Sequence, residues 1–316
     1  MAEQRPSQPA KPPRHDVHGV LLLDKPIGWS SNDALIRAKR LLWAKKAGHT
    51  GTLDPLATGL LPLCFGEATK FSQDLLEADK TYETVVRLGI KTSTADAEGE
   101  VLSERPVAVT PEQLRAAVDR FIGEIDQVPP MHSALKKDGK PLYEYARAGQ
   151  TVERAARRVT IRAIDVLATD LDAAAPTVTL RVCCSKGTYI RTLGEDLGEA
   201  LGCGAHLVAL RRTQVGSLTL DGAVTLQALE AASEDQRAAL LAPVDALLQT
   251  LPRVELGAED SRRFLHGQRL PLRLSLPGAE QVRVYGARGE AALSLLGVAA
   301  WQDGVLRPER LVHSTR

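Results

Sequence analysis

The run from Gly48 to Leu61, with the sequence GHTGTLDPLATGLL, constrains the fold of this chain more than any other feature. It is too rich in glycine and threonine to fill a core, and Pro55 restricts the backbone of Asp54 as well as its own. A carboxylate held in this way, with no other acid, lysine or cysteine in the same turn, is typical of a single acid that acts as nucleophile or general base. An isolated Leu-Asp-Pro is more often a helix N-cap with proline at the first helical position, so both interpretations stay open here.

Composition predicts an ordinary globular protein of two domains, because 316 residues with 44% apolar content can bury a large core. Since the formal net charge is only +1, affinity for a polyanion has to come from local clusters of Lys and Arg. The four cysteines have no zinc-ligand spacing, no segment is apolar for long enough to span a membrane, and residues 1–17 contain no apolar run. We therefore expect a cytoplasmic protein with reduced thiols and a disordered N-terminal tail.

Hydrophobic periodicity predicts an α+β chain. Apolar or alternating runs predict strands at residues 19–24, 60–65, 81–90, 177–183 and 205–216. Helices are predicted at 32–44 after a cap at Ser30 or Ser31, at 110–122 after the capping box of Thr110 and Gln113, before residue 201, and at 258–265. Beyond residue 252, short apolar runs such as 282–285 and 291–296 predict a separate small β domain.

Residues 127–162 form a basic segment that the net charge conceals. The segment contains three acidic residues and eight basic ones. The basic residues are Lys136, Lys137, Lys140, Arg147, Arg154, Arg157, Arg158 and Arg162. Tyr143 and Tyr145 lie among them, in a stretch that also contains Pro129-Pro130 and two glycines. Basic side chains interleaved with aromatic ones suit a mobile clamp on a nucleic-acid backbone, and a solvated loop is an equally acceptable interpretation of the composition.

Tyr189 and Arg191 lie two residues apart, after the predicted strand at 177–183. If the chain is still extended there, both side chains point to the same side. An arginine in this place is suited to pair with a distant carboxylate, which holds the carboxylate in its ionised form and lowers its pKa. The simpler interpretation is a surface arginine.

Taken together, these residues resemble the bacterial tRNA pseudouridine synthases of the TruB type, over about residues 19–212. The resemblance rests on several long motifs in the same order: Asp24-Lys25-Pro26 with Gly28-Trp29-Ser30-Ser31, the GHTGTLDPLATGLLP run, Asp79-Lys80-Thr81-Tyr82, the segment from Gln127 to Arg147, Ser185-Lys186-Gly187-Thr188-Tyr189-Ile190-Arg191, and Leu210-Arg211-Arg212. The segment from about residue 252 resembles, more weakly, the PUA-related RNA-binding domain of these enzymes.

The resemblance implies an α+β pseudouridine synthase fold, in which helices flank a central mixed, largely antiparallel sheet. A catalytic domain would span residues 18–251, with a thumb-like insertion at about 127–160, and a PUA-like domain would span residues 252–316. The implied activity is that of an isomerase that flips a uridine out of the T arm of tRNA, at position 55, and converts it to pseudouridine. No cofactor, metal or obligatory protein partner is implied, and we expect a monomer.

The resemblance also assigns roles to residues. It makes Asp54 the catalytic aspartate, stacks Tyr82 on the flipped base, and places Tyr189 and Arg191 in the active site, the latter as partner of Asp54. RNA contacts are expected from His49, Lys25, Lys136, Arg147 and Leu210. Three routes stay open for Asp54: attack on the ribose carbon, addition to the uracil ring, and removal of a ribose proton. Two alternatives remain, a tRNA-folding chaperone without essential catalysis and a guide-RNA-dependent enzyme acting on ribosomal RNA.

Overall fold

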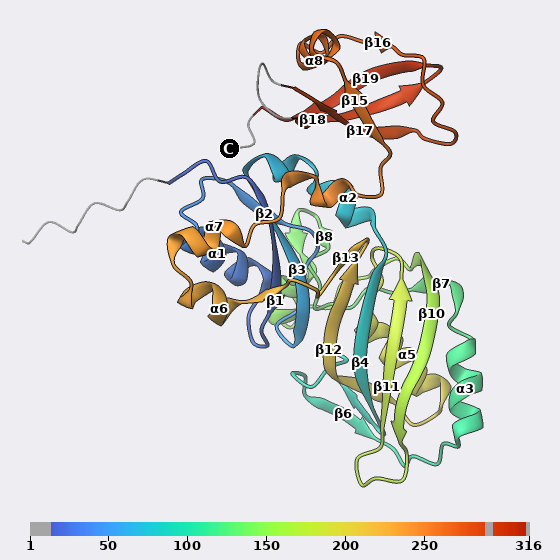
Figure 1. The fold of residues 1–316 in the computed structure, drawn as a ribbon. Helices are drawn as coiled ribbons and strands as arrows, with labels where there is room; N and C mark the ends of the chain where they lie inside the picture. Colours follow the sequence, from blue (N-terminus) through green and yellow to red (C-terminus); the bar gives the residue numbers. More distant parts are fainter. Residues whose placement is uncertain (1–13, 288–292, 314–316) are drawn as a thin grey trace, which may run out of the picture.

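The computed structural model describes residues 14–287 and 293–313, and it contains a large central sheet, a smaller C-terminal sheet and helices around both (Figure 1). The strands of the central sheet are β1 (Gly19–Lys25), β2 (Ala47–His49), β3 (Ala57–Phe65), β4 (Lys80–Leu88), β7 (Gly123–Gln127), β10 (Arg157–Asp170), β11 (Thr177–Cys184), β12 (Ala205–Val215), β13 (Leu218–Thr219) and β14 (Val224–Thr225). Two short hairpins lie outside it, β5 (Ile90–Thr92) with β6 (Val101–Glu104) and β8 (Lys136–Lys137) with β9 (Lys140–Pro141).

The central sheet has ten strands, and its main path runs β14-β1-β3-β12-β4-β11-β10-β7, with β13 paired to β12 and β2 paired to β3. The β1–β14 and β3–β12 pairs are parallel, and the other pairs are antiparallel. The expected mixed, largely antiparallel sheet is therefore confirmed. Strand β12 comes late in the sequence but lies between β3 and β4, which are close neighbours in the chain.

Helices cover the central sheet in two groups (Figure 1). The helices are α1 (Ser31–Leu41), α2 (Ser72–Glu77), α3 (Pro111–Asp119), α4 (Leu142–Arg147), α5 (Ile190–Ala200), α6 (Leu226–Ala231), α7 (Glu234–Ala239) and α8 (Ala258–Leu265), with 3-10 helices η1 (Gly66–Lys70) and η2 (Val244–Leu248). Helices α1 and α6 pack together near β1, whereas α5 packs on β12 and β4 and is contacted by α3. None of the helices in the described ranges is both long and apolar enough to cross a membrane.

The C-terminal residues form a second sheet of five strands, in the order β15-β17-β18-β19-β16. Its strands are β15 (Arg253–Leu256), β16 (Leu270–Pro271), β17 (Gln281–Gly286), β18 (Ser294–Gln302) and β19 (Val305–Leu311). A buried apolar cluster joins this sheet to the helical segments η1, α2 and η2, and it includes Phe71, Leu75, Leu247, Tyr285 and Val298. The two sheets are thus connected by packing as well as by the chain.

The local signals for helix starts are confirmed. The hydroxyl of Ser30 caps α1 by accepting a hydrogen bond from the backbone N–H of Asp33 at 3.1 Å. Thr110 and Gln113 make the predicted capping box of α3, and α8 has the predicted bounds. These elements were predictable because each cap depends on residues close to one another in the sequence.

Other boundaries differ from the predictions. Helix α1 ends at Leu41 instead of residue 44, because Trp43 adopts a φ of 50°, which no α-helix accommodates. The last basic residues of the 127–162 segment, from Arg157, belong to β10 and pair with β7 in the central sheet. His15, expected in a disordered tail, pairs with the chain beside Ala44. Residues 1–13 of that tail, and residues 291–292 of a predicted strand, lie outside the described residues.

Candidate active site

Asp54 lies in a turn that leads directly into β3. The backbone N–H of Ala57 donates to the carbonyl oxygen of Asp54 at 3.0 Å, which closes a turn with Pro55 at its second position. The N-cap interpretation is therefore wrong, since no helix follows Asp54. The fixed φ of proline suits the second position of a β-turn as well as it suits the first position of a helix, so sequence alone did not separate the two.

The Asp54 turn is anchored on both sides. Ser31, at the start of α1, bonds Leu53 twice: its hydroxyl accepts from the backbone N–H at 2.7 Å and donates to the carbonyl at 3.0 Å. The backbone N–H of Gly28 donates to the carbonyl of Pro55 at 2.8 Å. Because the segment from Gly28 to Ser31 thus bonds the residues on both sides of Asp54, the Asp54 carboxylate is held in a defined position.

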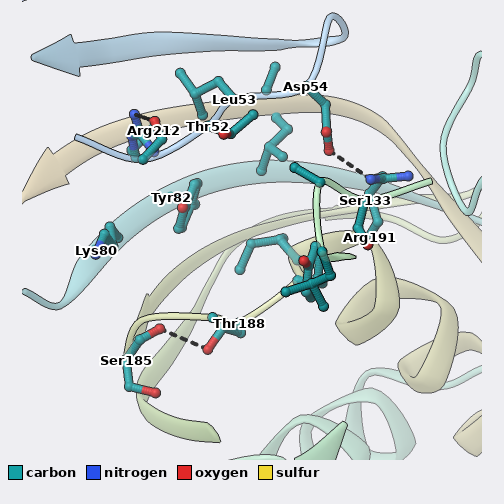
Figure 2. Close-up of a pocket in the computed structure, with 18 of the residues that line it drawn as sticks. Thr52, Leu53, Asp54, Lys80, Tyr82, Ser133, Ser185, Thr188, Arg191 and Arg212 are labelled. Atoms are coloured by element: carbon teal, nitrogen blue, oxygen red, sulfur yellow. Dashed lines mark hydrogen bonds and ion pairs between the residues drawn. The ribbon is translucent and has the colours of Figure 1, made fainter. Parts of the chain in front are cut away.

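Arg191 is the ion-pair partner of Asp54, as the sequence suggested. Its Nη2 atom lies 2.9 Å from Oδ2 of Asp54, and the two side chains point at one another in Figure 2. The same guanidinium donates to the carbonyls of Thr94 at 3.0 Å and His132 at 2.6 Å, and its Nη1 lies 3.5 Å from Oδ2 of Asp96. The Arg191 side chain is 4% exposed and that of Asp54 is 35% exposed, so the arginine is buried behind a carboxylate that solvent reaches.

The electrostatics of this pair differ in one respect from expectation. Burial raises the pKa of the Asp54 carboxyl above its ordinary value, the charge of Arg191 opposes that increase, and the nearby Asp96 adds to it. Arg191 thus favours the ionised form as predicted, but burial and the charge of Asp96 together outweigh it, so the pKa is raised instead of lowered. The result is a carboxylate that is partly desolvated and still paired, which makes it a stronger base than a free aspartate.

A cavity of about 310 Å³ opens beside Asp54. Its walls include five residues predicted for the site, which are Asp54, Tyr82, Tyr189, Arg191 and Leu210. Asp54 comes from the turn before β3, Tyr82 from β4, Leu210 from β12, and Tyr189 and Arg191 from the start of α5. Figure 2 shows Tyr82 and Arg191 on different elements. This volume is at the lower end of the range of about 300 to 1,000 Å³ that is usual for small-molecule sites.

Tyr189 and Arg191 reach this cavity from a junction that is not extended throughout. Tyr189 has extended backbone angles and is the N-cap of α5, and Arg191 is already in the first helical turn. Gln127 fixes Tyr189 by accepting from its backbone N–H at 2.7 Å and donating to its carbonyl at 3.1 Å. Burial raises the pKa of both Tyr189 and Tyr82, so both phenols stay protonated at neutral pH.

Comparison with known proteins identifies the family. Residues 39–190 match the N-terminal domain of TruB family pseudouridylate synthases, residues 191–249 match a tRNA pseudouridylate synthase B C-terminal domain, and residues 252–312 match the C-terminal domain of pseudouridine synthase II TruB. The chain is 95% identical to tRNA pseudouridine synthase B of Ralstonia nicotianae, over 99% of this chain and 100% of that protein. The chain belongs to the TruB family. The corresponding protein of Ralstonia pickettii is 86% identical over the same shares.

Solved structures of more distant proteins share the TruB fold. A crystal structure of a Cbf5-Nop10-Gar1 complex matches with a TM-score of 0.68 and 26% identity, over 94% of this chain and 85% of that chain. A structure of an H/ACA RNP bound to a substrate RNA containing 2′-deoxyuridine matches with a TM-score of 0.67 and 25% identity, over 93% and 84%. The fold is therefore that of a pseudouridine synthase with a β-rich C-terminal part.

Lys25, for which the family resemblance implies a phosphate contact, is the last residue of β1. The residue is fully buried, with an exposed fraction of 0%, and its ammonium group donates to the carbonyls of Pro26 at 2.9 Å and Trp29 at 2.6 Å. Burial lowers its pKa to about 8. The hydrogen bonds described for this ammonium group thus go to the loop beside Asp54, and the expected phosphate contact stays a prediction.

The remaining predicted RNA-binding residues lie outside the cavity wall. Lys136 and Arg147 are exposed on the basic insertion, and the guanidinium of Arg147 lies 5.4 Å from the ring centre of Tyr143. His49 is half-buried in β2, and burial together with the charge of Arg212 lowers its pKa. None of these three side chains lines the cavity.

Sequence reasoning missed two cations in the cavity wall. Arg212 is 1% exposed and donates to the carbonyls of Leu60 at 2.8 Å and, near Asp54, Gly51 at 3.2 Å. Lys80 is 7% exposed, and burial lowers its pKa to about 8. Arg212 follows Leu210 by two positions on β12, and Lys80 precedes Tyr82 by two positions on β4. Residues two apart on a strand point to the same face, so strand alternation was a signal for both cations.

Asp96 is a third missed residue, and it lies in a turn whose sequence carries no signal for a buried acid. It is 2% exposed and shares Arg191 with Asp54. The two buried or half-buried carboxylates of the site, Asp54 and Asp96, thus both pair with Arg191.

Among the residues that the structure describes, no group of three or more His, Cys, Asp or Glu is arranged to hold a metal ion.

Proposed function

We infer that this chain is an isomerase that converts a uridine of tRNA to pseudouridine, and we propose the uridine at position 55 of the T loop as its target. The observation that carries the inference is the Asp54–Arg191 ion pair in the wall of a cavity, in a chain that is 95% identical to a tRNA pseudouridine synthase B. A paired, partly desolvated carboxylate beside a cavity suits a reaction that depends on one acidic residue.

The reaction breaks the bond between the uracil nitrogen and the ribose, turns the uracil within the site, and joins its carbon 5 to the ribose carbon. The hydrogen of carbon 5 leaves as a proton, and the uracil nitrogen released from the ribose gains a proton, so the product is an isomer of the substrate. Asp54 is proposed to attack the ribose carbon, add to the uracil ring or remove a ribose proton, and each of these steps requires its ionised form. Arg191, 2.9 Å away, stabilises that form, and its three other contacts, with Thr94, His132 and Asp96, hold its guanidinium in place.

The target base has to leave the stack of the T loop before it reaches Asp54, at a cost of about a few kcal/mol. We propose that the ring of Tyr82, which lies in the cavity wall, stacks on the extruded base. Stacking on an aromatic side chain contributes about 1 to 3 kcal/mol, which is comparable with that cost. Leu210 adds an apolar surface on the neighbouring strand, and Tyr189 supplies a protonated phenol for proton transfer.

Contacts with the rest of the RNA are proposed from outside the cavity. Lys136 and Arg147 bind phosphates through the insertion at about 127–160, and His49 holds the rearranged loop. We propose a catalytic domain at residues 18–251, preceded by a tail at 1–17, and a PUA-like RNA-binding domain at 252–316. The protein is proposed to act in the cytoplasm as a monomer without a protein partner.

Release of tritium from T-arm RNA labelled at carbon 5 of uridine tests the reaction and its site together. Wild-type protein is expected to release tritium from RNA with the target uridine and not from RNA in which that position is cytidine. Asp54→Asn is expected to abolish release while leaving the Kd for tRNA within about twofold, since the amide keeps the shape of the turn. Tritium release by Asp54→Asn at the wild-type rate refutes the assignment of Asp54.

The same assay separates two other functions. A tRNA-folding chaperone assists folding without chemistry, so the Asp54→Asn variant would retain it and wild-type protein would release no tritium. The solved structures that match include an H/ACA RNP, which motivates a guide-RNA-dependent alternative. Purified protein that modifies a bare T-arm hairpin, with no added RNA or protein, excludes that dependence.

A further inference from the structure

The short helix α2 lies next to the C-terminal sheet (Figure 1), and its residue Leu76 lines the cavity. It has six residues, Ser72–Glu77, and no side chain caps its N-terminus. A helix of this length has almost no stability of its own, so contacts with the rest of the protein determine where it lies. Those contacts come from two directions.

On one side, Arg310 of β19, in the C-terminal sheet, contacts the first half of α2. Its guanidinium makes two hydrogen bonds to the carboxylate of Asp74, at 2.9 and 3.0 Å, and a third to the carbonyl of Lys70 at 3.2 Å. It also lies 5.2 Å from the ring centre of the buried Phe71. The ammonium group of Lys70 donates in return to the carbonyl of Leu311 at 2.8 Å. A two-point contact between arginine and a carboxylate fixes orientation as well as distance.

On the other side, the end of α2 forms part of the cavity wall. Leu76 lines the cavity, and its Cδ2 atom lies 3.9 Å from where a Cβ would be on Gly51, three residues before Asp54. The ammonium group of Lys80 donates to the carbonyls of Leu75 at 3.2 Å, Leu76 at 2.7 Å and Ala78 at 2.5 Å. A change in the position of α2 therefore moves an apolar wall beside the Asp54 turn.

We propose that Arg310 is a positioning residue for the reaction: by holding Asp74, it sets the place of α2 and so of Leu76 against the Asp54 turn. This inference rests on the proposed function. It assigns to the C-terminal sheet a part in the chemical step, separate from any contact of that sheet with RNA. Since small displacements of a catalytic group lower rates steeply, loss of Arg310 should reduce kcat more than it raises KM.

The test compares a hairpin that contains only the T stem and loop with full-length tRNA, using tritium release under multiple turnover. We expect Arg310→Ala and Asp74→Asn each to lower kcat about tenfold on both RNAs. The matched control is Arg307→Ala, on the same strand, whose side chain is 57% exposed and 3.8 Å from Glu309; its kcat on the hairpin should equal that of the wild type. A loss for Arg310→Ala that is confined to KM on full-length tRNA indicates an RNA contact and overturns the proposal.

Two further variants separate positioning from loss of folding. The exchanged pair Arg310→Asp with Asp74→Arg should recover most of the lost kcat, because it restores opposite charges at the contact. In a Leu76→Ala background, Arg310→Ala should lower kcat by less than twofold, since the same wall is already removed. Losses that multiply fully in that double variant, or an exchanged pair no better than Arg310→Ala, contradict the proposed route through α2.

Amide hydrogen exchange gives a readout that does not depend on turnover. Faster exchange at residues 51–57 in Arg310→Ala, and not in Arg307→Ala, supports the coupling between β19 and the Asp54 turn. Unchanged exchange there overturns it. A wild-type protein that releases no tritium refutes the proposed function, and the exchange measurement still decides whether Arg310 controls the turn.

Discussion

Removal of the Arg191 charge should shift the acid limb of the pH–rate profile upward. Replacement of Arg191 alone would leave the carboxylate of Asp96, which is 2% exposed, without a counter-charge, and breaking such a buried pair typically costs about 3 to 5 kcal/mol of stability. The informative variant is therefore Arg191→Met in an Asp96→Asn background, compared with Asp96→Asn alone. Both lack the Asp96 charge, so they differ in the charge and contacts of Arg191.

The size of the shift follows from the geometry. Unit charges at the 2.9 Å separation of Asp54 and Arg191 interact by about 6 kcal/mol at an effective dielectric constant of about 20. Because the Asp54 side chain is 35% exposed, solvent screening reduces this to about 1 to 3 kcal/mol. At about 1.4 kcal/mol per pKa unit, loss of Arg191 should raise the pKa of Asp54 by about one to two units.

Burial already raises the pKa of Asp54 above the ordinary value for aspartate, which is about 3.9. As the pH is lowered, the wild type should therefore begin to lose activity at a pH higher than this value. Asp96 contributes to that increase, and Asp96→Asn alone should move the acid limb to lower pH. The double variant should move it back up by about one to two pH units relative to Asp96→Asn. The assay is tritium release in single turnover from pH 4 to 9, with thermal unfolding measured across the same range. Acid limbs of the two variants that coincide within about 0.3 pH units would refute the reasoning.

Two further predictions concern the backbone and the RNA surface. Gly59→Ala should lower the free energy of unfolding by about 2 to 5 kcal/mol in urea titrations, because Gly59 has a φ of 98° and an added Cβ would lie 2.2 Å from a carbonyl oxygen of the paired strand β12. Gly222→Ala, at a φ of 74° with no atom within 4 Å, should cost only about 1 to 2 kcal/mol, and equal losses would contradict the packing argument. Lys136→Ala and Arg147→Ala should each weaken tRNA binding and reduce the slope of log K against log salt by about 0.7 to 0.9. Lys91→Ala, which removes a lysine paired with Glu195, is the control that should leave the slope unchanged.

The parts of the fold that the sequence predicted correctly depend on neighbours in the chain. The capping box of α3 and the bounds of α8 involve residues within one or two helical turns, so a single sequence contains the whole signal. The end of α1 and the turn at Asp54 were mispredicted because the chain outside the segment decides them. Trp43 has a positive φ at the point where its carbonyl accepts a hydrogen bond from the backbone N–H of His15. The Asp54 turn leads into a strand because β12 pairs with the start of β3.

The same distinction applies to the site. Asp54, Tyr82 and Arg191 were found through motifs, and their convergence on one cavity follows from a sheet order that no local pattern contains. Asp96 was missed because its burial arises from the long-range contact with Arg191, not from its own sequence context. The burial of Lys25 was likewise not predictable, because the carbonyls of Pro26 and Trp29 accept its hydrogen bonds only once the loop after β1 has folded.

The position of β12 in the central sheet affects how the chain folds during its synthesis. Strands β3 and β4 are adjacent in the chain, but they flank a gap that only residues 205–215 fill, and α5, which carries Arg191, packs on that same strand. Until those residues are synthesised, the nascent chain presents two facing strand edges with unpaired N–H and C=O groups. Folding therefore has to wait for a late, non-local step, as in chains of high contact order. A ribosome-bound chain that stops before residue 205 would contain Asp54 and Arg191 but no assembled site, so it would be vulnerable to aggregation before it could be an enzyme.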